Sequence, residues 1–197
     1  MPHIKKLVVG FLDTNCYIIS SGKHAVLIDP GEDFKRILKE LEGLKLEKII
    51  LTHLHFDHII AAKKIKKATS ALICCNKKDF KILNNDLLKE DDVDENLRAD
   101  FKFKILNLNF KIISTPGHTP GSICLYDEKN RILFSGDTIF AGSIGVTNYP
   151  GGDFKKIKNS IEKKLLTLPD DTHVYPGHGP DFVLGEEKEA IKSILEQ

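Results

Sequence analysis

A run of potential metal ligands directly follows an apolar segment, and this run constrains the fold more than any other feature of the chain. The apolar segment is residues 48–51, and the run is Thr52-His53-Leu54-His55-Phe56-Asp57-His58. Imidazole and carboxylate groups are ligands for zinc, iron or manganese. Four such groups within six residues would be costly to bury without a cation. Because six residues cannot all converge on one ion, the run predicts ligands divided between two neighbouring ions. The alternative is a solvated polar loop.

Three more residues of these chemical types lie at similar places later in the chain. Each follows an apolar run and lies in a loop marked by Gly or Pro. An open sheet that delivers such loops from its strand ends collects their side chains in one cleft. Alone, each histidine could equally be structural, but together with the first run they indicate one metal site. These residues are His118 after 110–113, Asp137 after 131–134 and His178 after 173–175.

The alternation of apolar runs and amphipathic segments predicts strands followed by a helix, twice over. Between the two halves, the highly charged residues 76–100 predict short helices and a mobile connection. In chain order we expect strands at 6–9, 16–19, 25–28, 48–51, 72–75, 101–106, 110–113, 122–126, 131–134 and 173–175, and helices at 33–42, 58–68, 153–166 and 185–195.

Composition restricts the class of protein. At 197 residues and 22.1 kDa, with 41% hydrophobic and 29% charged residues, the chain predicts a single globular domain over residues 1–197. A formal net charge of +1 argues against nucleic acid or an anionic membrane as a partner, and no apolar run approaches transmembrane length. No signal peptide is visible, so a cytoplasmic location is expected.

Four cysteines are expected to be buried apolar residues in a reducing compartment. Adjacent Cys74 and Cys75 would point to opposite faces of a strand, so they do not predict a zinc pair.

These motifs resemble those of metallo-β-lactamase-fold hydrolases, over nearly the whole chain from Leu27-Ile28-Asp29-Pro30-Gly31 to Tyr175-Pro176-Gly177-His178-Gly179. A narrower likeness, to the short single-domain glyoxalase II-like (hydroxyacylglutathione hydrolase) proteins, is carried by Asn15-Cys16-Tyr17 and by segments 115–122, 136–145 and 150–153. The resemblance implies an α/β fold, an αββα sandwich of two mixed β-sheets flanked by helices.

The resemblance also implies two divalent metal ions, with zinc as the first expectation and iron or manganese as alternatives. A hydroxide bridging the two ions would be the nucleophile, and the carboxylates assigned to catalysis are Asp57 and Asp137. The first ion would be held by His53, His55 and His118, the second by Asp57, His58 and His178, and Asp137 would bridge them.

Residues around these ligands carry further expectations. Asp29 could orient a ligand histidine through the other ring nitrogen, or it could simply form the turn before Pro-Gly. Phe140, Tyr149 and Phe56 could line a substrate cleft, with core packing as the alternative.

The expected reaction is hydrolysis of a thioester such as an S-2-hydroxyacylglutathione, with a small-molecule substrate and a monomer or small homo-oligomer. Val146 and Asn148 stand where short relatives typically show Arg and Asp. The C-terminal helical domain that binds glutathione in full-length glyoxalase II is not expected here. A thiol carrier other than glutathione is therefore an open alternative. An iron-dependent persulfide dioxygenase, a lactonase and a nucleic-acid-processing hydrolase are the alternatives.

Overall fold

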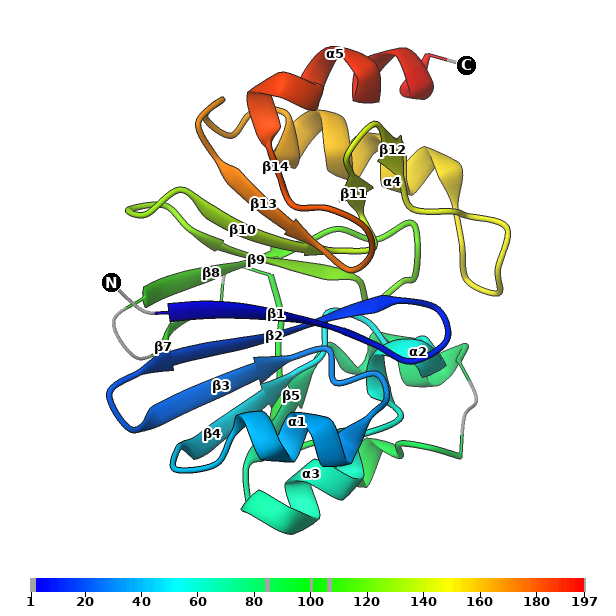
Figure 1. The fold of residues 1–197 in the computed structure, drawn as a ribbon. Coiled ribbons are helices and arrows are strands. Elements are labelled where there is room, and N and C mark those ends of the chain that lie inside the picture. Colours follow the sequence, from blue (N-terminus) through cyan, green and yellow to red (C-terminus); the bar gives the residue numbers. More distant parts are fainter. Residues whose placement is uncertain (1–2, 84–85, 100, 106–107, 197) are drawn as a thin grey trace.

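The computed structural model describes residues 3–83, 86–99, 101–105 and 108–196. Its centre is a pair of mixed six-stranded sheets (Figure 1). In the first sheet, two antiparallel pairings are followed by three parallel ones, in the order β1-β2-β3-β4-β5-β6. These strands are β1 (His3–Val9), β2 (Thr14–Ser21), β3 (His24–Ile28), β4 (Lys45–Ile50), β5 (Leu72–Cys75) and β6 (Glu95–Asn96).

The second sheet has the order β14-β13-β10-β9-β8-β7, and only the β10–β13 pairing is parallel. A separate two-stranded ribbon, β11 (Ile139–Phe140) with β12 (Ser143–Ile144), follows β10. The strands of the second sheet are β7 (Lys102–Ile105), β8 (Leu108–Ser114), β9 (Ile123–Asp127), β10 (Ile132–Gly136), β13 (His173–Pro176) and β14 (Phe182–Val183).

Helices cover the outer face of each sheet. Figure 1 shows α1 (Phe34–Glu40) and α3 (Ala62–Thr69) on one side of the sheet pair, and α4 (Phe154–Ser160) and α5 (Leu184–Leu195) on the other. A π-helical turn, η3 (Ile161–Leu165), continues α4. The remaining helical elements are α2 (Phe56–Ile59) and the 3-10 turns η1 (Lys77–Lys81) and η2 (Glu90–Asp92).

Three apolar layers follow from this arrangement. Side chains such as Leu27 and Ile49 pack with Ile37 and Ile65 between the first sheet and its helices. A middle layer joins the two sheets, with Ile28, Ile50, Phe110 and Phe134 among its members. The third layer packs Leu133 and Val174 against Ile157, Ile161 and Ile191 of the second pair of helices. Successive residues of a strand point to opposite faces, so each sheet feeds two layers, and the predicted αββα sandwich is confirmed.

The two adjacent cysteines illustrate this alternation. Cys75 belongs to the layer under the first pair of helices, and Cys74 belongs to the layer between the sheets. All four cysteines are buried and unbridged, as expected.

The structure differs from the sequence-based expectation around the first ligand run. β4 begins three residues earlier than expected and ends at Ile50, and the helix expected over 58–68 is two helices, α2 and α3. Asp57 and His58 both lie in α2, so the helical region begins two residues before the expected start at residue 58. The helix breaks because the Ala61 amide donates to the carbonyl oxygens of Pro30 and Gly31, which diverts it from the helical pattern.

Other differences are smaller. The segment 76–100 contains the expected short helical turns and also the unexpected strand β6, while residues 84, 85 and 100 lie outside the described residues. Leu106, the end of an expected strand, is also outside them. The short strands β11, β12 and β14 were not predicted because two residues are too few to show a periodic pattern.

Strand direction brings the ligand loops together. β3 and β4 are parallel, so the turn after β3 and the ligand run after β4 leave the same edge of the first sheet. In the second sheet β8, β10 and β13 run in one direction, because β9 is antiparallel to both β8 and β10. In Figure 1 these loops, α2 and the β11–β12 ribbon lie toward the right-hand end of the sandwich.

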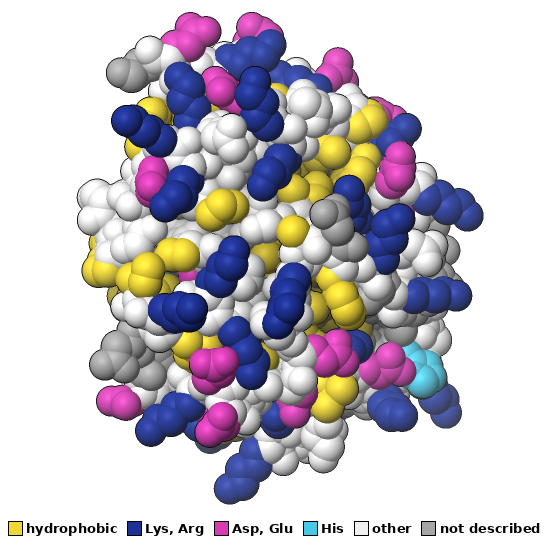
Figure 2. Space-filling view, turned by 180° about the vertical axis from the view of Figure 1, so that it is seen from behind, with side chains coloured by type: hydrophobic (Ala, Val, Ile, Leu, Met, Phe, Trp, Pro, Cys, Tyr) yellow, Lys and Arg dark blue, Asp and Glu magenta, His cyan; other side chains and the backbone are white. Residues whose placement is uncertain are grey.

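The outer surface is highly charged. On the face seen in Figure 2, Lys and Arg side chains spread across the middle, whereas Asp and Glu side chains gather toward the top and bottom. None of the helices in the described part of the chain is long and apolar enough to cross a membrane.

Candidate metal centre

The first predicted set of ligands comes together at the interface of the two halves of the chain. The ligand atoms of His53, His55 and His118 all lie within 4.8 Å of one another. His53 Nε2 and His55 Nδ1 are 3.2 Å apart. The first two residues come from the loop after β4 and the third from the loop after β8, so this set joins the two sheets.

The second predicted set is also assembled. Asp57, His58 and His178 place their ligand atoms within 4.8 Å of one another. His58 Nε2 lies 3.3 Å from Asp57 Oδ2 and 3.3 Å from His178 Nε2. A short helix, α2, supplies two of these residues, and its first turn aims both side chains into the centre.

Asp137 lies between the two sets. Its Oδ2 is 3.5 Å from His118 Nε2 in the first set and 3.5 Å from His178 Nε2 in the second, and its Oδ1 is 3.5 Å from His58 Nε2. A carboxylate has two oxygens, so a residue in this position can contact two ions at once.

Three histidines are oriented by bonds on their outer nitrogens. The Nδ1 of His58 donates to Asp29 Oδ2 at 3.0 Å, that of His118 to the Val146 carbonyl oxygen at 2.7 Å, and that of His178 to the Leu12 carbonyl oxygen at 3.0 Å. Each of these bonds keeps a proton on Nδ1 and turns the inner Nε2 toward the centre.

Asp29 connects several parts of the site. Its Oδ1 accepts from the Thr52 amide at 2.8 Å, and its Oδ2 accepts from the Thr52 hydroxyl at 2.6 Å as well as from His58. Since the Thr52 hydroxyl donates to Asp29, it accepts from His53 Nδ1, 3.1 Å away. Asp29 also occupies the turn with φ 48°, so both roles considered for it, orientation and turn formation, are present.

Burial keeps the first set of histidines neutral. It lowers the pKa of His53 well below its usual range and lowers that of His118, and positive charge on neighbouring histidines adds to the effect at His53. Burial and the same kind of repulsion lower the pKa of His55 to about 4. Neutral imidazole is the form that binds metal.

Around the second set, carboxylates and histidines shift each other's pKa values. Burial alone would lower the pKa of His58, but the neighbouring Asp137 and Asp29 carboxylates outweigh it and raise this pKa well above its ordinary value. At Asp137 burial acts to raise the pKa, and the nearby histidines, His58 first, lower it overall. The centre therefore holds ionised carboxylates that attract positive charge, whether protons or metal ions.

Unsatisfied atoms show that the donor set fits metal ions. Four buried side-chain polar atoms of the described residues have no hydrogen-bond partner, and two of them, His118 Nε2 and Asp137 Oδ1, point into this cluster. Buried polar atoms without a partner are costly, and a divalent cation would satisfy both. The mixture of imidazole and carboxylate donors suits zinc, iron or manganese.

Two of the three aromatic residues predicted for the substrate cleft contact the cluster directly, and the third, Phe56, is an exposed residue of α2. Phe140 lines a cavity of about 380 Å³ together with His118, Asp137 and His178. Its ring is 6.3 Å from that of His178, between centroids. The Tyr149 ring is 5.7 Å from the His55 ring and is largely exposed.

Sequence reasoning missed two residues that support the ligand loops. The Thr14 hydroxyl donates to Asp57 Oδ2 at 3.0 Å. The fully buried Asp79 accepts from the Leu54 amide in the first ligand run, and from the Thr119 hydroxyl and the Gly121 amide just after His118. Asp79 lies in a charged segment with no other sign of burial, so no local pattern could have singled it out.

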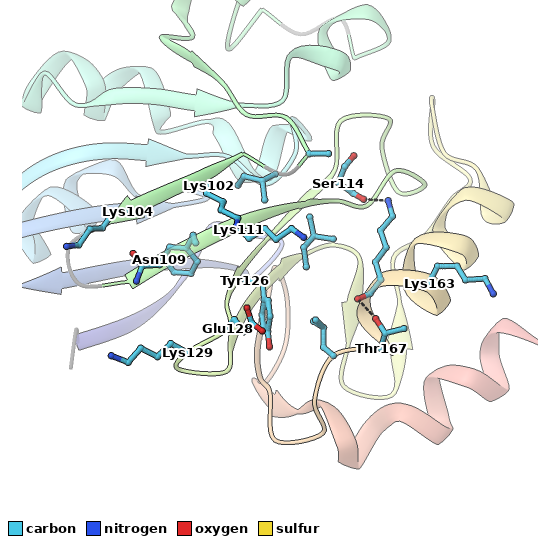
Figure 3. Close-up of a pocket in the computed structure, with 16 residues that line it drawn as sticks. Lys102, Lys104, Asn109, Lys111, Ser114, Tyr126, Glu128, Lys129, Lys163 and Thr167 are labelled. Atoms are coloured by element: carbon cyan, nitrogen blue, oxygen red, sulfur yellow. Dashed lines mark hydrogen bonds between the residues drawn. The ribbon is translucent and has the colours of Figure 1, made fainter.

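A larger groove, of about 1040 Å³, lies on the outer face of the second sheet beside η3. Figure 3 shows labelled lysines on β7, on β8 and in η3. Lys164 of η3 donates to the Ser114 carbonyl oxygen at 2.6 Å. Its lining includes six lysines and one carboxylate, that of Glu128. All clusters of potential metal ligands found among the described residues belong to the His/Asp centre, and none of them includes a residue that lines this groove.

Known proteins share both the sequence and the fold. The family model of the Metallo-beta-lactamase superfamily matches residues 9–178. Hydroxyacylglutathione hydrolase GloC of Haemophilus influenzae is 33% identical over 201 residues, which are 94% of this chain and 95% of that protein.

Two solved structures extend this comparison. The BLEG-1 B3 metallo-beta-lactamase has a TM-score of 0.89 at 32% identity, covering 99% of this chain and 100% of the other. TTHA1623 in a di-iron-bound form has a TM-score of 0.80 at 31% identity, covering 95% and 98%. With the fold, the ordered ligand motifs and these matches in agreement, the chain belongs to the metallo-beta-lactamase superfamily of metal-dependent hydrolases.

Proposed function

We propose that this protein is a thioester hydrolase of the glyoxalase II type, with an S-2-hydroxyacylglutathione as its reference substrate. The observation that carries the proposal is the pair of ligand triads on either side of Asp137, next to an open cavity. The similarity to a hydroxyacylglutathione hydrolase over 94% of the chain supports the choice of substrate.

The ligand sets assign a role to each side chain. His53, His55 and His118 would hold one ion, Asp57, His58 and His178 the other, and Asp137 would contact both. Bound divalent cations supply Lewis acidity toward a carbonyl group and lower the pKa of water. We take zinc as the first candidate, and the di-iron form of TTHA1623 makes iron the main alternative.

The protein's own contribution is preorganisation. Asp29 and the carbonyl oxygens of Val146 and Leu12 hold protons on the outer nitrogens of three ligand histidines, so these rings need not turn to present Nε2 to an ion. Phe140 and Val146 give the cavity beside the ligands apolar walls, which reduces competition from bulk water.

The test is hydrolysis of S-D-lactoylglutathione by metal-loaded protein, followed by loss of thioester absorbance, with metal content measured on the same sample. We expect chelator-sensitive turnover that Asp137→Ala abolishes together with part of the metal content. Asp171→Ala, which removes an exposed carboxylate, is the control. Turnover that persists in Asp137→Ala would contradict the mechanism.

The fold match to a B3 metallo-beta-lactamase makes lactam hydrolysis a second candidate. The same protein should therefore be assayed with nitrocefin and with a simple lactone. Oxygen consumption with glutathione persulfide tests the dioxygenase alternative. If one of these reactions is fast and no thioester is cleaved by protein that carries two ions, the thioester proposal is wrong.

A further inference from the structure

The groove of about 1040 Å³ on the outer face of the second sheet has no part in the proposed hydrolysis. One wall is the sheet face of β7 and β8, and the other is η3. Figure 3 shows Lys102 and Lys111 in the middle of this face, with Lys163 on the helical side. We call it the lysine groove, and its lysines are Lys102, Lys104, Lys111, Lys129, Lys163 and Lys164.

The lysine groove exists because α4 and α5 cover only part of the second sheet. Tyr126 and Leu133 are direct partners across β9 and β10, and both belong to the apolar layer under these helices. The same row of outward side chains continues as Lys111 on β8 and Lys102 on β7. The outer face of the sheet therefore changes from apolar to cationic where the apolar layer ends.

Most of the positive charge in the groove has no counterion within the protein. Lys102 and Lys111 face each other across β7 and β8, and like charges placed directly opposite destabilise a sheet. Lys102, Lys104, Lys129 and Lys163 form no ion pair with another described residue. The lining contains a single carboxylate, that of Glu128. An anion bound in the groove would relieve this repulsion.

The helical wall of the groove is held in place. η3 is a π-helical turn in which the Leu166 amide donates to the Ile161 carbonyl oxygen at 2.9 Å. Such turns are rare and are frequent at functional sites. Lys164 Nζ donates to the Ser114 carbonyl oxygen at 2.6 Å and so ties η3 to the end of β8. The two walls are therefore joined before a ligand enters.

The lining favours a small molecule over a nucleic acid or a membrane. Two aromatic residues line the groove, Phe110 and Tyr126, and they are only 1% and 6% exposed, so neither offers a face for stacking bases. The groove is concave, unlike a surface that lies on a bilayer, and its volume is at the upper end of the range for small-molecule sites. Ile113 and Leu168 add apolar wall beside the lysines.

The spacing of the charges favours phosphate over a row of carboxylates. Lys102 and Lys104 are two residues apart on one strand face, which is about 7 Å, and Lys111 is closer still to Lys102 across the strands. A condensed phosphate chain concentrates several charges within such a span, whereas an extended acidic peptide places one carboxylate on each face per about 7 Å. The ammonium group of lysine binds phosphate as a point charge.

We propose that the lysine groove binds a condensed phosphate chain, either free or as part of a nucleotide-like small molecule. Lys102, Lys104 and Lys111 donate to the phosphate oxygens from the sheet. Where an organic group is attached, it packs against Ile113 and Leu168. None of the predicted metal ligands lines the groove, so this site does not depend on the proposed thioester hydrolysis.

The test is calorimetry of metal-loaded protein with sodium tripolyphosphate and, separately, with ATP. We expect both to bind, and Lys102→Gln/Lys104→Gln to weaken binding about 100-fold, because each lost hydrogen bond to a charged group costs about tenfold. The matched control is Lys45→Gln/Lys67→Gln, which removes the same charge from exposed lysines of β4 and α3 and should bind like the wild type.

The two probes distinguish the sources of the phosphate. Tighter binding of ATP than of tripolyphosphate assigns a role to the apolar wall and supports a nucleotide-like ligand. Equal affinities support recognition of the phosphate chain alone.

Further measurements separate the groove from the metal centre and from unfolding. Lys102→Gln/Lys104→Gln should keep its thioester turnover and metal content, and its Tm should not fall, since the repulsion between Lys102 and Lys111 is removed. Lys129→Gln/Lys163→Gln changes exposed residues outside the strands and gives a second test, with binding expected to weaken at least about tenfold.

Three results would overturn the proposal. The first is that neither phosphate compound binds the wild type. The second is that both groove variants bind as tightly as the wild type, which would place the anion on the metal ions or elsewhere. The third is that a hexaglutamate peptide or a short RNA binds more tightly than tripolyphosphate and loses this binding in the groove variants, which would assign the groove to an acidic protein or a nucleic acid.

Discussion

A ligand histidine can bind a metal ion through either ring nitrogen. The hydrogen-bond partner of the other nitrogen decides which one faces the ion. Here His58 has a carboxylate partner, whereas His118 and His178 have backbone carbonyl oxygens. The ligand types could be read from the sequence, but the carbonyl partners could not, because every residue carries the same carbonyl group.

Asp79 joins the two ligand loops of the first triad, because its carboxylate accepts hydrogen bonds from both loops. We expect Asp79→Asn to lower the free energy of unfolding by about 1–3 kcal/mol, because the amide nitrogen that replaces one carboxylate oxygen cannot accept a hydrogen bond. We also expect weaker binding of the ion held by His53, His55 and His118 than of the other ion.

Denaturant unfolding and cobalt titration of the Asp79→Asn variant measure these two effects. Asp91→Asn, at an exposed carboxylate in η2, is the matched control. Equal loss of both cobalt sites would show that the hydrogen bonds of Asp79 stabilise the fold as a whole and not the first triad in particular.

At the scale of elements, the sequence was most informative where a long apolar run meets a chemically distinctive loop. The strands before Asp137 and His178 were predicted to within two residues of their ends, because the apolar side chains stop where the strand leaves the core. The helix expected over 58–68 was not divided into α2 and α3, since the four residues of α2 are about one helical turn and carry no period. The break between the two helices is set instead by the turn at Pro30 and Gly31, which is distant in sequence.

Glycine 177 shows how closely the β13 loop approaches the site. A Cβ on this residue would lie 2.0 Å from Asp137 Oδ1 and 2.8 Å from His58 Cε1. Gly177→Ala should therefore displace the bridging carboxylate and reduce kcat/KM about 100-fold, as expected for a shift of about 1 Å at a reacting centre.

The matched control is Gly185→Ala at the start of α5. There the added Cβ would lie 2.7 Å from the Asp170 Cβ, so the crowding is similar but remote from the ligands. Metal analysis and steady-state kinetics of both variants give the comparison. If the two variants lose activity to the same degree, the effect of Gly177→Ala comes from the fold and not from Asp137.

At the scale of the whole molecule, the metal centre lies at the junction of two similar halves. His53 to His58 come from the first sheet, and His118, Asp137 and His178 come from the second. Periodicity alone predicted strands and helices but not which strands pair, because pairing depends on contacts between residues distant in sequence. The four-layer arrangement was anticipated from the resemblance of the motifs to a known fold.

Because each half would contribute ligands to both proposed ions, removing the ions should weaken the contact between the halves. An ion present at about 100 times its dissociation constant stabilises the folded state by about 2.7 kcal/mol, so two such ions contribute about 5.4 kcal/mol. For a protein of this length we expect chelation to lower Tm by about 10–20 °C. Thermal unfolding with and without chelator measures this, and Asp137→Ala should show a smaller shift. An identical Tm with and without ions would contradict the expectation that the ions hold the two halves together.

His58 and His178 are 120 residues apart, so the ribosome adds these two ligands to the chain at different times. At about 5–20 residues per second, roughly 6–24 seconds pass between the synthesis of these two ligands. During that interval the nascent chain offers the imidazoles and carboxylate of its first half, later joined by His118 and Asp137, while the second triad still lacks His178. The ions found in freshly isolated protein should therefore reflect the metal supply during translation, whereas reloading of the folded apoprotein gives the equilibrium preference.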